Sequence, residues 1–143
     1  MDVRNARVEP VLEHGGTCRT YPMFPKESLR DETMGGYLEF VVEFELMAGA
    51  KLEPHYHDSD EFYYILSGNA VMQIAAEVRE LGPGDLVRIP RNAAHSIWPT
   101  DASGTFRAFA FATSYQPEGA THTPCELPEP AAARQVGQVG SDA

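Results

Sequence analysis

Residues 49–68 read Gly-Ala-Lys-Leu-Glu-Pro-His-Tyr-His-Asp-Ser-Asp-Glu-Phe-Tyr-Tyr-Ile-Leu-Ser-Gly. His55 and His57 lie two residues apart, and alternate residues of a strand face the same side, so both imidazoles can reach one point. The polar triplet 58–60 is typical of a turn, and the aromatic, β-branched run 62–66 is typical of a following strand. A chain that turns back at 58–60 brings the Glu61 carboxylate opposite both histidines. This combination predicts a site for a divalent transition metal.

A second stretch, residues 84–95, reads Gly-Asp-Leu-Val-Arg-Ile-Pro-Arg-Asn-Ala-Ala-His. It predicts a strand between a glycine turn and a proline, followed by a strand that begins at His95. Alternatives remain: a His-x-His pair can be two surface histidines, and a lone histidine can be structural. Three of the five histidines and a glutamate at these spacings nevertheless favour a metal site.

The two stretches resemble the two sequence motifs of the cupin family. Gly49-x5-His55-x-His57-x3-Glu61-x6-Gly68 matches the first motif at every defining position, and Gly84-x5-Pro90-x-Asn92-x2-His95 is similar to the second. Two positions depart from the family pattern, because Asn92 replaces the usual glycine and Pro99 the usual asparagine. Asparagine tolerates the left-handed backbone conformation, so a turn at Asn92 is still expected.

The resemblance implies an all-β fold, the antiparallel double-stranded β-helix or jelly-roll barrel of cupins. It also implies one divalent transition metal ion per chain (Fe, Ni, Zn, Mn or Cu) and, by analogy, a homodimer. The implied metal ligands are His55, His57, Glu61 and His95.

Composition and charge set the limits of the prediction. The 143 residues suit one domain, and 12 glycines with 11 prolines suit a turn-rich β protein. The net charge of −10 argues against nucleic acid as a partner. No apolar run reaches the roughly 20 residues that span a bilayer. The N-terminus lacks a signal pattern, so we expect a cytoplasmic protein without a membrane partner. Cys18 and Cys125 are then free thiols, with a disulfide as the alternative.

The chain divides into three segments. Residues 1–36 form an N-terminal arm with short strands, including one near 8–12 and a helical turn near 28–32. Residues 37–115 form the barrel, and strict alternation over 37–47 predicts its first strand. Residues 116–143 form a tail rich in proline and alanine that we expect to be partly disordered.

Several side chains beyond the ligands are candidates for catalysis. Tyr63 shares the strand face of Glu61 and could donate a hydrogen bond to a substrate, or simply pack as an aromatic core residue. Glu39, Glu43 and Glu45 share the second face of the strand over 37–47, where we expect solvated carboxylates, with one inward-facing acid or base as the alternative. Of these groups Glu43 is a candidate for catalysis, together with Arg107. His14 and His122 lie outside the motifs, and we expect solvated side chains; either could become a distal catalytic base if its segment folds over the barrel mouth.

These observations predict a metal-dependent enzyme that acts on a small oxygen-rich organic substrate, such as an enol, a diketone, an aromatic or a polyketide-like compound. The resemblance leaves dioxygenase and cyclase or isomerase chemistry both open. The alternative is a non-catalytic cupin that uses its metal to bind or sense a small molecule.

Overall fold

The computed structural model describes residues 5–24, 38–114 and 119–131. Its regular elements are strands and one short 3-10 helix. They are β1 (Val11–Glu13), η1 (His14–Gly16), β2 (Cys18–Phe24), β3 (Leu38–Leu46), β4 (His55–His57), β5 (Asp60–Ser67), β6 (Ala70–Ile74), β7 (Glu77–Leu81), β8 (Leu86–Ile89), β9 (His95–Pro99), β10 (Phe106–Thr113) and β11 (His122–Pro124). No helix within these described ranges is long and apolar enough to cross a membrane.

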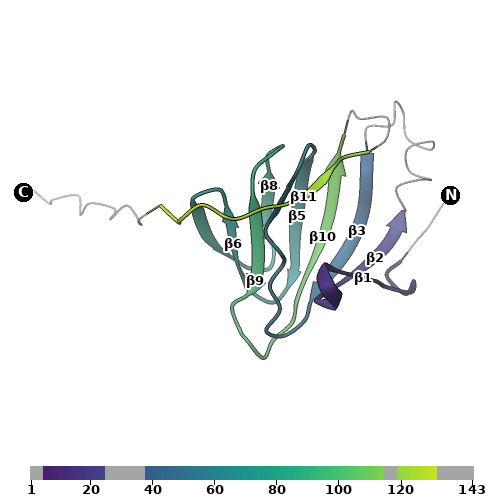
Figure 1. Cartoon of the computed structure of the whole chain (residues 1–143). Coiled ribbons are helices and arrows are strands. Elements are labelled where there is room, and N and C mark those ends of the chain that lie inside the picture. Colours follow the sequence, from purple (N-terminus) through teal and green to yellow (C-terminus); the bar gives the residue numbers. More distant parts are fainter. Residues whose placement is uncertain (1–4, 25–37, 115–118, 132–143) are drawn as a thin grey trace, which may run out of the picture.

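The strands form two antiparallel sheets (Figure 1). The six-stranded sheet has the order β1-β2-β3-β10-β5-β8, and the five-stranded sheet has the order β11-β4-β9-β6-β7. The consecutive strands β4 and β5 belong to different sheets, so the predicted turn at 58–60 carries the chain from one sheet to the other. This arrangement confirms the predicted jelly-roll fold and lets Glu61 face the two histidines.

Period-two patterning places the core between the sheets. Along β10, Phe106, Ala108, Ala110 and Ala112 are buried, and the residues between them are half-buried. The inward side chains pack with Leu46 of β3 and with other fully buried aliphatic residues. Burial of these apolar side chains is the main stabilising term for such a domain.

One strand departs from the alternation that the sequence predicted. The pairing of β10 with β3 shifts register where Ala112 faces Phe40 and Thr113 faces Leu38, which leaves Glu39 as an extra residue in β3. Such a bulge reverses the direction of the local side chains. Glu39 is therefore buried, where alternation had placed it on the outer face with solvent, and its Oε1 accepts a hydrogen bond of 2.9 Å from the Ala120 N–H.

Two turns hold the motifs in place. Gly68 has φ +75°, and a side chain there would collide with the Thr105 carbonyl, so only glycine fits this hairpin. Asn92 has φ +61°, which confirms the left-handed turn expected from its sequence position. Its N–H donates to the His57 carbonyl at 2.7 Å, so the second motif is tied directly to the first.

The segments at both ends of the chain complete the sheets. The β1–β2 hairpin extends the six-stranded sheet beyond β3, and β11 pairs with β4 at the edge of the other sheet. After β11 the chain continues along the five-stranded sheet, where Gln73 Nε2 donates to the Pro128 carbonyl at 2.8 Å and Ala131 N–H to the Ala76 carbonyl at 2.8 Å. Residues 119–131 of the predicted tail are thus part of the fold. The helical turn expected near 28–32 lies outside the described residues.

Candidate metal centre

A cavity of about 480 Å³ opens between the two sheets. Its walls come mainly from apolar side chains and its polar groups from a few histidines and carboxylates. The lining residues include Glu13, His14, Cys18, Val42, Phe44, Leu52, His55, His57, Glu61, Tyr63 and His122. His95 is fully buried beside them, with its ring centroid 4.3 Å from that of His55 and 4.9 Å from that of His57.

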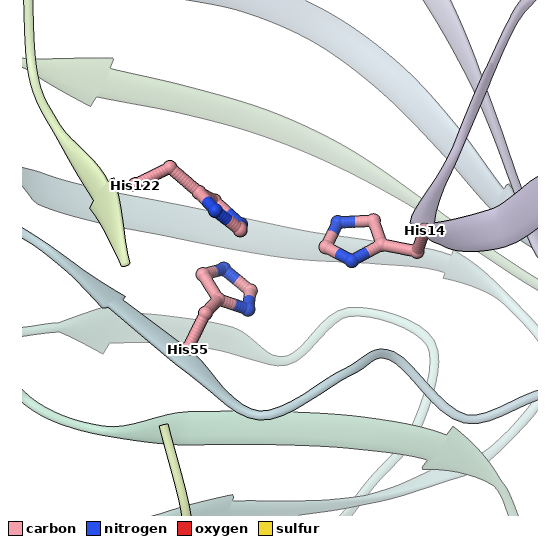
Figure 2. Close-up of side chains that lie close together, drawn as sticks. All are labelled: His14, His55 and His122. Carbon is pink, nitrogen blue, oxygen red and sulfur yellow. The ribbon is translucent and has the colours of Figure 1, made fainter. Parts of the chain in front are cut away.

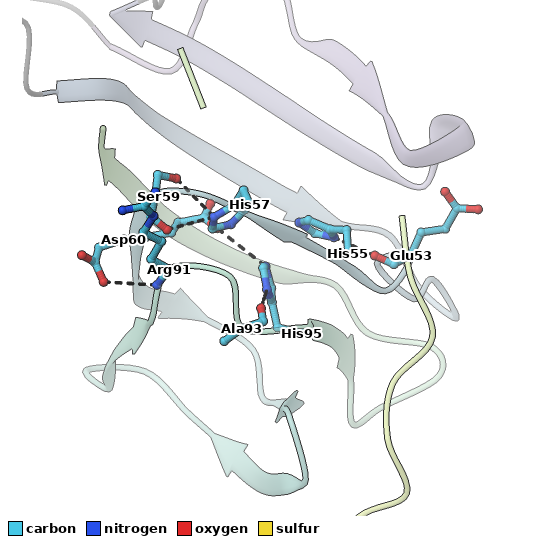
Figure 3. Close-up of polar contacts among 9 residues, drawn as sticks. Glu53, His55, His57, Ser59, Asp60, Arg91, Ala93 and His95 are labelled. Atoms are coloured by element: carbon cyan, nitrogen blue, oxygen red, sulfur yellow. Dashed lines mark hydrogen bonds and ion pairs between the residues drawn. The ribbon is translucent and has the colours of Figure 1, made fainter. Parts of the chain in front are cut away.

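Each imidazole of the motifs is oriented by a backbone carbonyl two residues away (Figure 3). The distances are 2.7 Å from His55 Nδ1 to the Glu53 oxygen, 3.0 Å from His57 Nδ1 to the Ser59 oxygen and 2.9 Å from His95 Nδ1 to the Ala93 oxygen. A carbonyl oxygen only accepts, so each Nδ1 carries the proton and donates it. The lone pair of each neutral ring is then on Nε2, and this kind of partner is what holds metal-binding histidines in place.

The three motif histidines form a group whose ligand nitrogens all lie within 4.8 Å of one another. We call His55, His57 and His95 the inner cluster. Glu61 joins it from the facing sheet, because its Oε2 lies 2.6 Å from His57 Nε2 and 3.7 Å from His95 Nε2. The structure thus brings together all four predicted metal ligands.

Two observations show that this group suits a cation. Among the described residues, His95 Nε2 is the buried side-chain atom that lacks a hydrogen-bond partner, and leaving such an atom unsatisfied is costly. In addition, the Nε2 lone pair of a neutral His57 and the Glu61 carboxylate are both acceptors, so their 2.6 Å approach requires a positive charge between them. A proton or a metal ion can supply that charge. Three imidazole nitrogens and a carboxylate suit a divalent transition metal.

Burial and neighbouring charges shift the pKa values of the three rings in different directions. Desolvation and then the charge of His95 lower the pKa of His55 to about 3, and desolvation also lowers the pKa of His95. Burial acts in the same direction on His57, but the hydrogen bond and the charge of Glu61 outweigh it and raise the pKa of His57. Two of the rings are therefore held neutral, which is the form that binds metal.

Tyr63 reaches the cavity from β5, as strand parity predicted. Its side chain is buried, and its ring packs edge-on against Phe44 at 4.8 Å. Burial, followed by the charge of Glu61, raises the pKa of Tyr63 well above its ordinary value. Tyr63 is thus a permanent hydrogen-bond donor next to the inner cluster.

The structure does not bring Glu43 and Arg107 to the inner cluster. Arg107 Nε lies 2.6 Å from Glu43 Oε2, and its guanidinium also approaches Glu45 at 3.7 Å and lies over the Tyr21 ring at 4.7 Å. Neither residue lines the cavity. They form an ion pair across neighbouring strands, which explains both side chains without a catalytic role.

Sequence reasoning gave little weight to His14 and His122, yet both line the cavity mouth. The pairing of β11 with β4 places the His122 ring 4.2 Å from that of His55, and the hairpin of β1 and β2 places His14 at 5.3 Å from the same ring. No spacing in the sequence signals this contact, since residues 14, 55 and 122 meet only through long-range pairing.

Comparisons with known proteins agree with this fold. Residues 42–109 match the cupin domain. An uncharacterized protein of Streptomyces coelicolor is 30% identical over 78 residues, a match that covers 50% of this chain and 74% of that protein.

Two solved structures are also similar to this chain. One is a predicted oxalate decarboxylase from Thermotoga maritima, with a TM-score of 0.68, 19% identity and coverage of 78% of this chain and 97% of the other. The second is the polyketide cyclase RemF from Streptomyces resistomycificus, with a TM-score of 0.65, 22% identity and coverage of 89% and 86%. At these identities the structures show a shared fold. Together with the motifs, the matches show that the chain belongs to the cupin family.

Proposed function

We propose that the chain is a divalent-metal-dependent enzyme that acts on a small oxygen-rich organic molecule. The observation that carries the proposal is the buried, unpartnered His95 Nε2, which converges with two other imidazoles and a carboxylate at one side of a cavity. His55, His57, His95 and Glu61 would hold the metal, one of Fe, Ni, Zn, Mn and Cu. When bound, it supplies a Lewis acid for oxygen-bearing substrates or, if redox-active, a centre for oxygen chemistry.

The remaining cavity walls select and enclose the substrate. Val42, Phe44 and Leu52 are buried apolar residues on the cavity wall. They exclude water and favour an aromatic or otherwise hydrophobic skeleton. Tyr63 would donate its hydroxyl hydrogen to a substrate oxygen, since its raised pKa keeps it protonated.

The choice between an enzyme and a binding protein depends on acid and base groups beyond the ligands. The cavity contains such groups in Glu13, His14 and His122. The Glu13 carboxylate accepts a hydrogen bond from the Thr20 hydroxyl and lies next to His14 in sequence. Proton acceptors at the mouth can serve a substrate that is bound deeper in the cavity. They favour turnover over the alternative of a sensor or binding cupin.

Within the enzyme proposal, a dioxygenase and a cyclase or isomerase remain two candidate chemistries. Oxygen-bearing aromatic, enol, diketone or polyketide-like molecules fit both the apolar wall and a metal that binds oxygen. The similar structures include a predicted oxalate decarboxylase and a polyketide cyclase. At their low identities, the chemistry of this chain has to be inferred from its own cavity.

Metal analysis of the purified protein, followed by assays with diketones and flavonols, tests the proposal. Iron, copper or nickel with substrate-dependent oxygen uptake would support a dioxygenase. Product formation that continues without oxygen would support a cyclase or isomerase. Tight substrate binding with no product under either condition would favour the sensor alternative, and absence of any metal after reconstitution would overturn the proposal.

We also propose that the chain forms a homodimer, as the family resemblance implies. Sedimentation velocity at micromolar concentration tests it, and a monomer would contradict it. A cytoplasmic location likewise stays a prediction from the sequence, which cell fractionation would check.

A further inference from the structure

Three imidazoles from distant parts of the chain meet at the cavity mouth (Figure 2). His14 comes from η1, His55 from β4 and His122 from β11. The ring of His14 lies 5.3 Å from that of His55 and 5.6 Å from that of His122, and His55 and His122 are 4.2 Å apart. Their ligand nitrogens lie within 4.8 Å of one another, the same limit that the inner cluster meets. We call these three residues the outer cluster.

A left-handed turn carries His14 to the cavity mouth. His14 has φ +50°, and the two glycines that follow have φ +67° and +86°. Residues other than glycine are uncommon in the left-handed region, and asparagine and histidine are among those found there more often. The Thr17 hydroxyl and N–H both donate to the His14 carbonyl, at 2.8 and 3.4 Å, and hold the turn. The turn leaves the His14 imidazole at the cavity mouth, near the rings of His55 and His122.

The rings of His14 and His122 are free to bind a ligand. Within the described parts of the chain, their ring nitrogens make no hydrogen bond, in contrast to the three rings of the inner cluster. His122 is exposed and His14 half-buried. His122 stacks on His55 with an angle of 23° between the rings, so it must rotate to an edge-on position to coordinate, and its exposure permits that rotation. Glu13 beside His14 and the net charge of −10 both attract cations.

His55 belongs to both clusters, and this sharing has a chemical consequence. Its Nδ1 donates to the Glu53 carbonyl at 2.7 Å, so Nε2 is its single available lone pair. One lone pair binds one metal ion at a time. The inner and outer clusters therefore cannot both bind a metal through His55 at the same time. An ion held by His55 in one cluster can stay bound to His55 while it exchanges its other ligands for those of the second cluster.

We propose that His14, His55 and His122 form a second transition-metal site at the mouth, which captures an ion from solvent and passes it inward on the shared His55. The outer site itself stands on the geometry of this cluster alone. The transfer step rests on the inner metal centre proposed above.

The outer site can be isolated by disabling the inner one. In His57→Ala/His95→Ala protein, we expect one Cu²⁺ per chain, with an electron paramagnetic resonance signal split by imidazole nitrogens. Adding His14→Asn and His122→Ala should weaken this binding at least about ten-fold, because loss of even an outer-shell partner of a metal costs about 10–100-fold. Asparagine suits the left-handed turn, so His14→Asn removes the ligand and keeps the backbone. Thr123→Ala, on the same strand as His122, is the matched control.

The loading rate tests transfer in protein with an intact inner cluster, and it also serves if the doubly substituted background does not fold. At subsaturating Cu²⁺, His14→Asn/His122→Ala protein should load the inner site at least about ten-fold more slowly, with unchanged final occupancy. Thr123→Ala should load like the unsubstituted protein. Equal loading rates would overturn the transfer step. If His57→Ala/His95→Ala protein binds Cu²⁺ equally tightly with and without the His14→Asn and His122→Ala substitutions, the outer site is overturned. Neither result would touch the inner metal centre, whose failure would instead appear as loss of final occupancy.

Discussion

The inner cluster of His55, His57 and His95 and the outer cluster of His14, His55 and His122 share one imidazole and differ in how the others are held. Each inner ring is buried and donates Nδ1–H to a carbonyl two residues away. The outer rings of His14 and His122 are more exposed, and the contacts described for them are ring contacts. Fixed, dry ligands suit chemistry on a bound metal, whereas accessible and rotatable ligands suit capture.

The largest effect should come from breaking the inner cluster. His57→Ala should strip most of the bound metal, because it removes a direct ligand and leaves Glu61 without its 2.6 Å partner. We expect affinity to fall by more than the roughly 10–100-fold that an outer-shell change costs. Metal content after dialysis, measured by mass spectrometry, checks this. His122→Ala should keep the inner metal at equilibrium, and equal loss in both variants would remove the distinction between the clusters.

The two clusters also show what could be predicted from the sequence. His55, His57 and Glu61 are close in sequence, and strand parity with one turn brings them together. The same local rules predicted the first barrel strand from the alternation over 37–47 and the left-handed turn at Asn92. The outer cluster needs the pairing of β11 with β4 and of β2 with β3, and such long-range register has no local signature.

Local rules also failed where geometry changes within a strand. Alternation along 37–47 put Glu39 outside, but the bulge between β3 and β10 turns it inward. Parity correctly put Tyr63 in the cavity, whereas the choice of Glu43 and Arg107 rested on residue type alone, and the two pair with each other instead. Sequence gives the residue types that chemistry needs, and the register decides which of them face the site.

A smaller effect is expected from Tyr63, which should influence turnover without influencing metal binding. Tyr63→Phe keeps the ring against Phe44 and removes only the hydroxyl. Metal content should stay unchanged while turnover of a confirmed substrate falls, by up to about 10²–10³-fold if the hydroxyl donates to a developing oxyanion. Glu43→Gln is the matched control, and its turnover should match that of the unsubstituted protein because Glu43 does not line the cavity. Equal turnover in both variants would reduce Tyr63 to packing.

The pH dependence of the metal-free protein sharpens the contrast among the inner rings. Burial lowers the pKa of His55 from 6.5 to about 3 and also lowers the pKa of His95. Below pH 6.5 these two histidines therefore bind protons in the unfolded chain but stay neutral in the folded chain. The stability that these two rings give is present above pH 6.5 and is lost as the pH falls toward 3. His57 acts in the opposite sense, since its raised pKa gives stability that is lost as the pH rises through that pKa.

The effects of His55 and His95 on stability act against the effect of His57, and two rings should outweigh one. We therefore expect the free energy of unfolding of the metal-free protein to fall between pH 6.5 and pH 5, where His55 and His95 begin to be protonated in the unfolded chain. Urea denaturation at a series of pH values measures this. His55→Gln should flatten the dependence, because glutamine does not titrate. A stability that rises on acidification would mean that Glu61 and His57 dominate the cluster.

The smallest effect concerns a thiol on the cavity wall. Cys18 lines the cavity, and burial raises the pKa of its thiol to about 12, so at pH 8 only about one thiol in 10⁴ is the reactive thiolate. Cys125, by contrast, is half-buried on the segment after β11. Iodoacetamide should therefore modify one cysteine per native chain, Cys125, and both after unfolding, as intact mass would show. Cys125→Ser protein should remain unmodified while folded. Rapid labelling of Cys18 in that variant would mean that water reaches this part of the cavity wall and that the Cys18 sulfur is available as a further metal ligand. The histidine clusters would then not account for all of the metal binding.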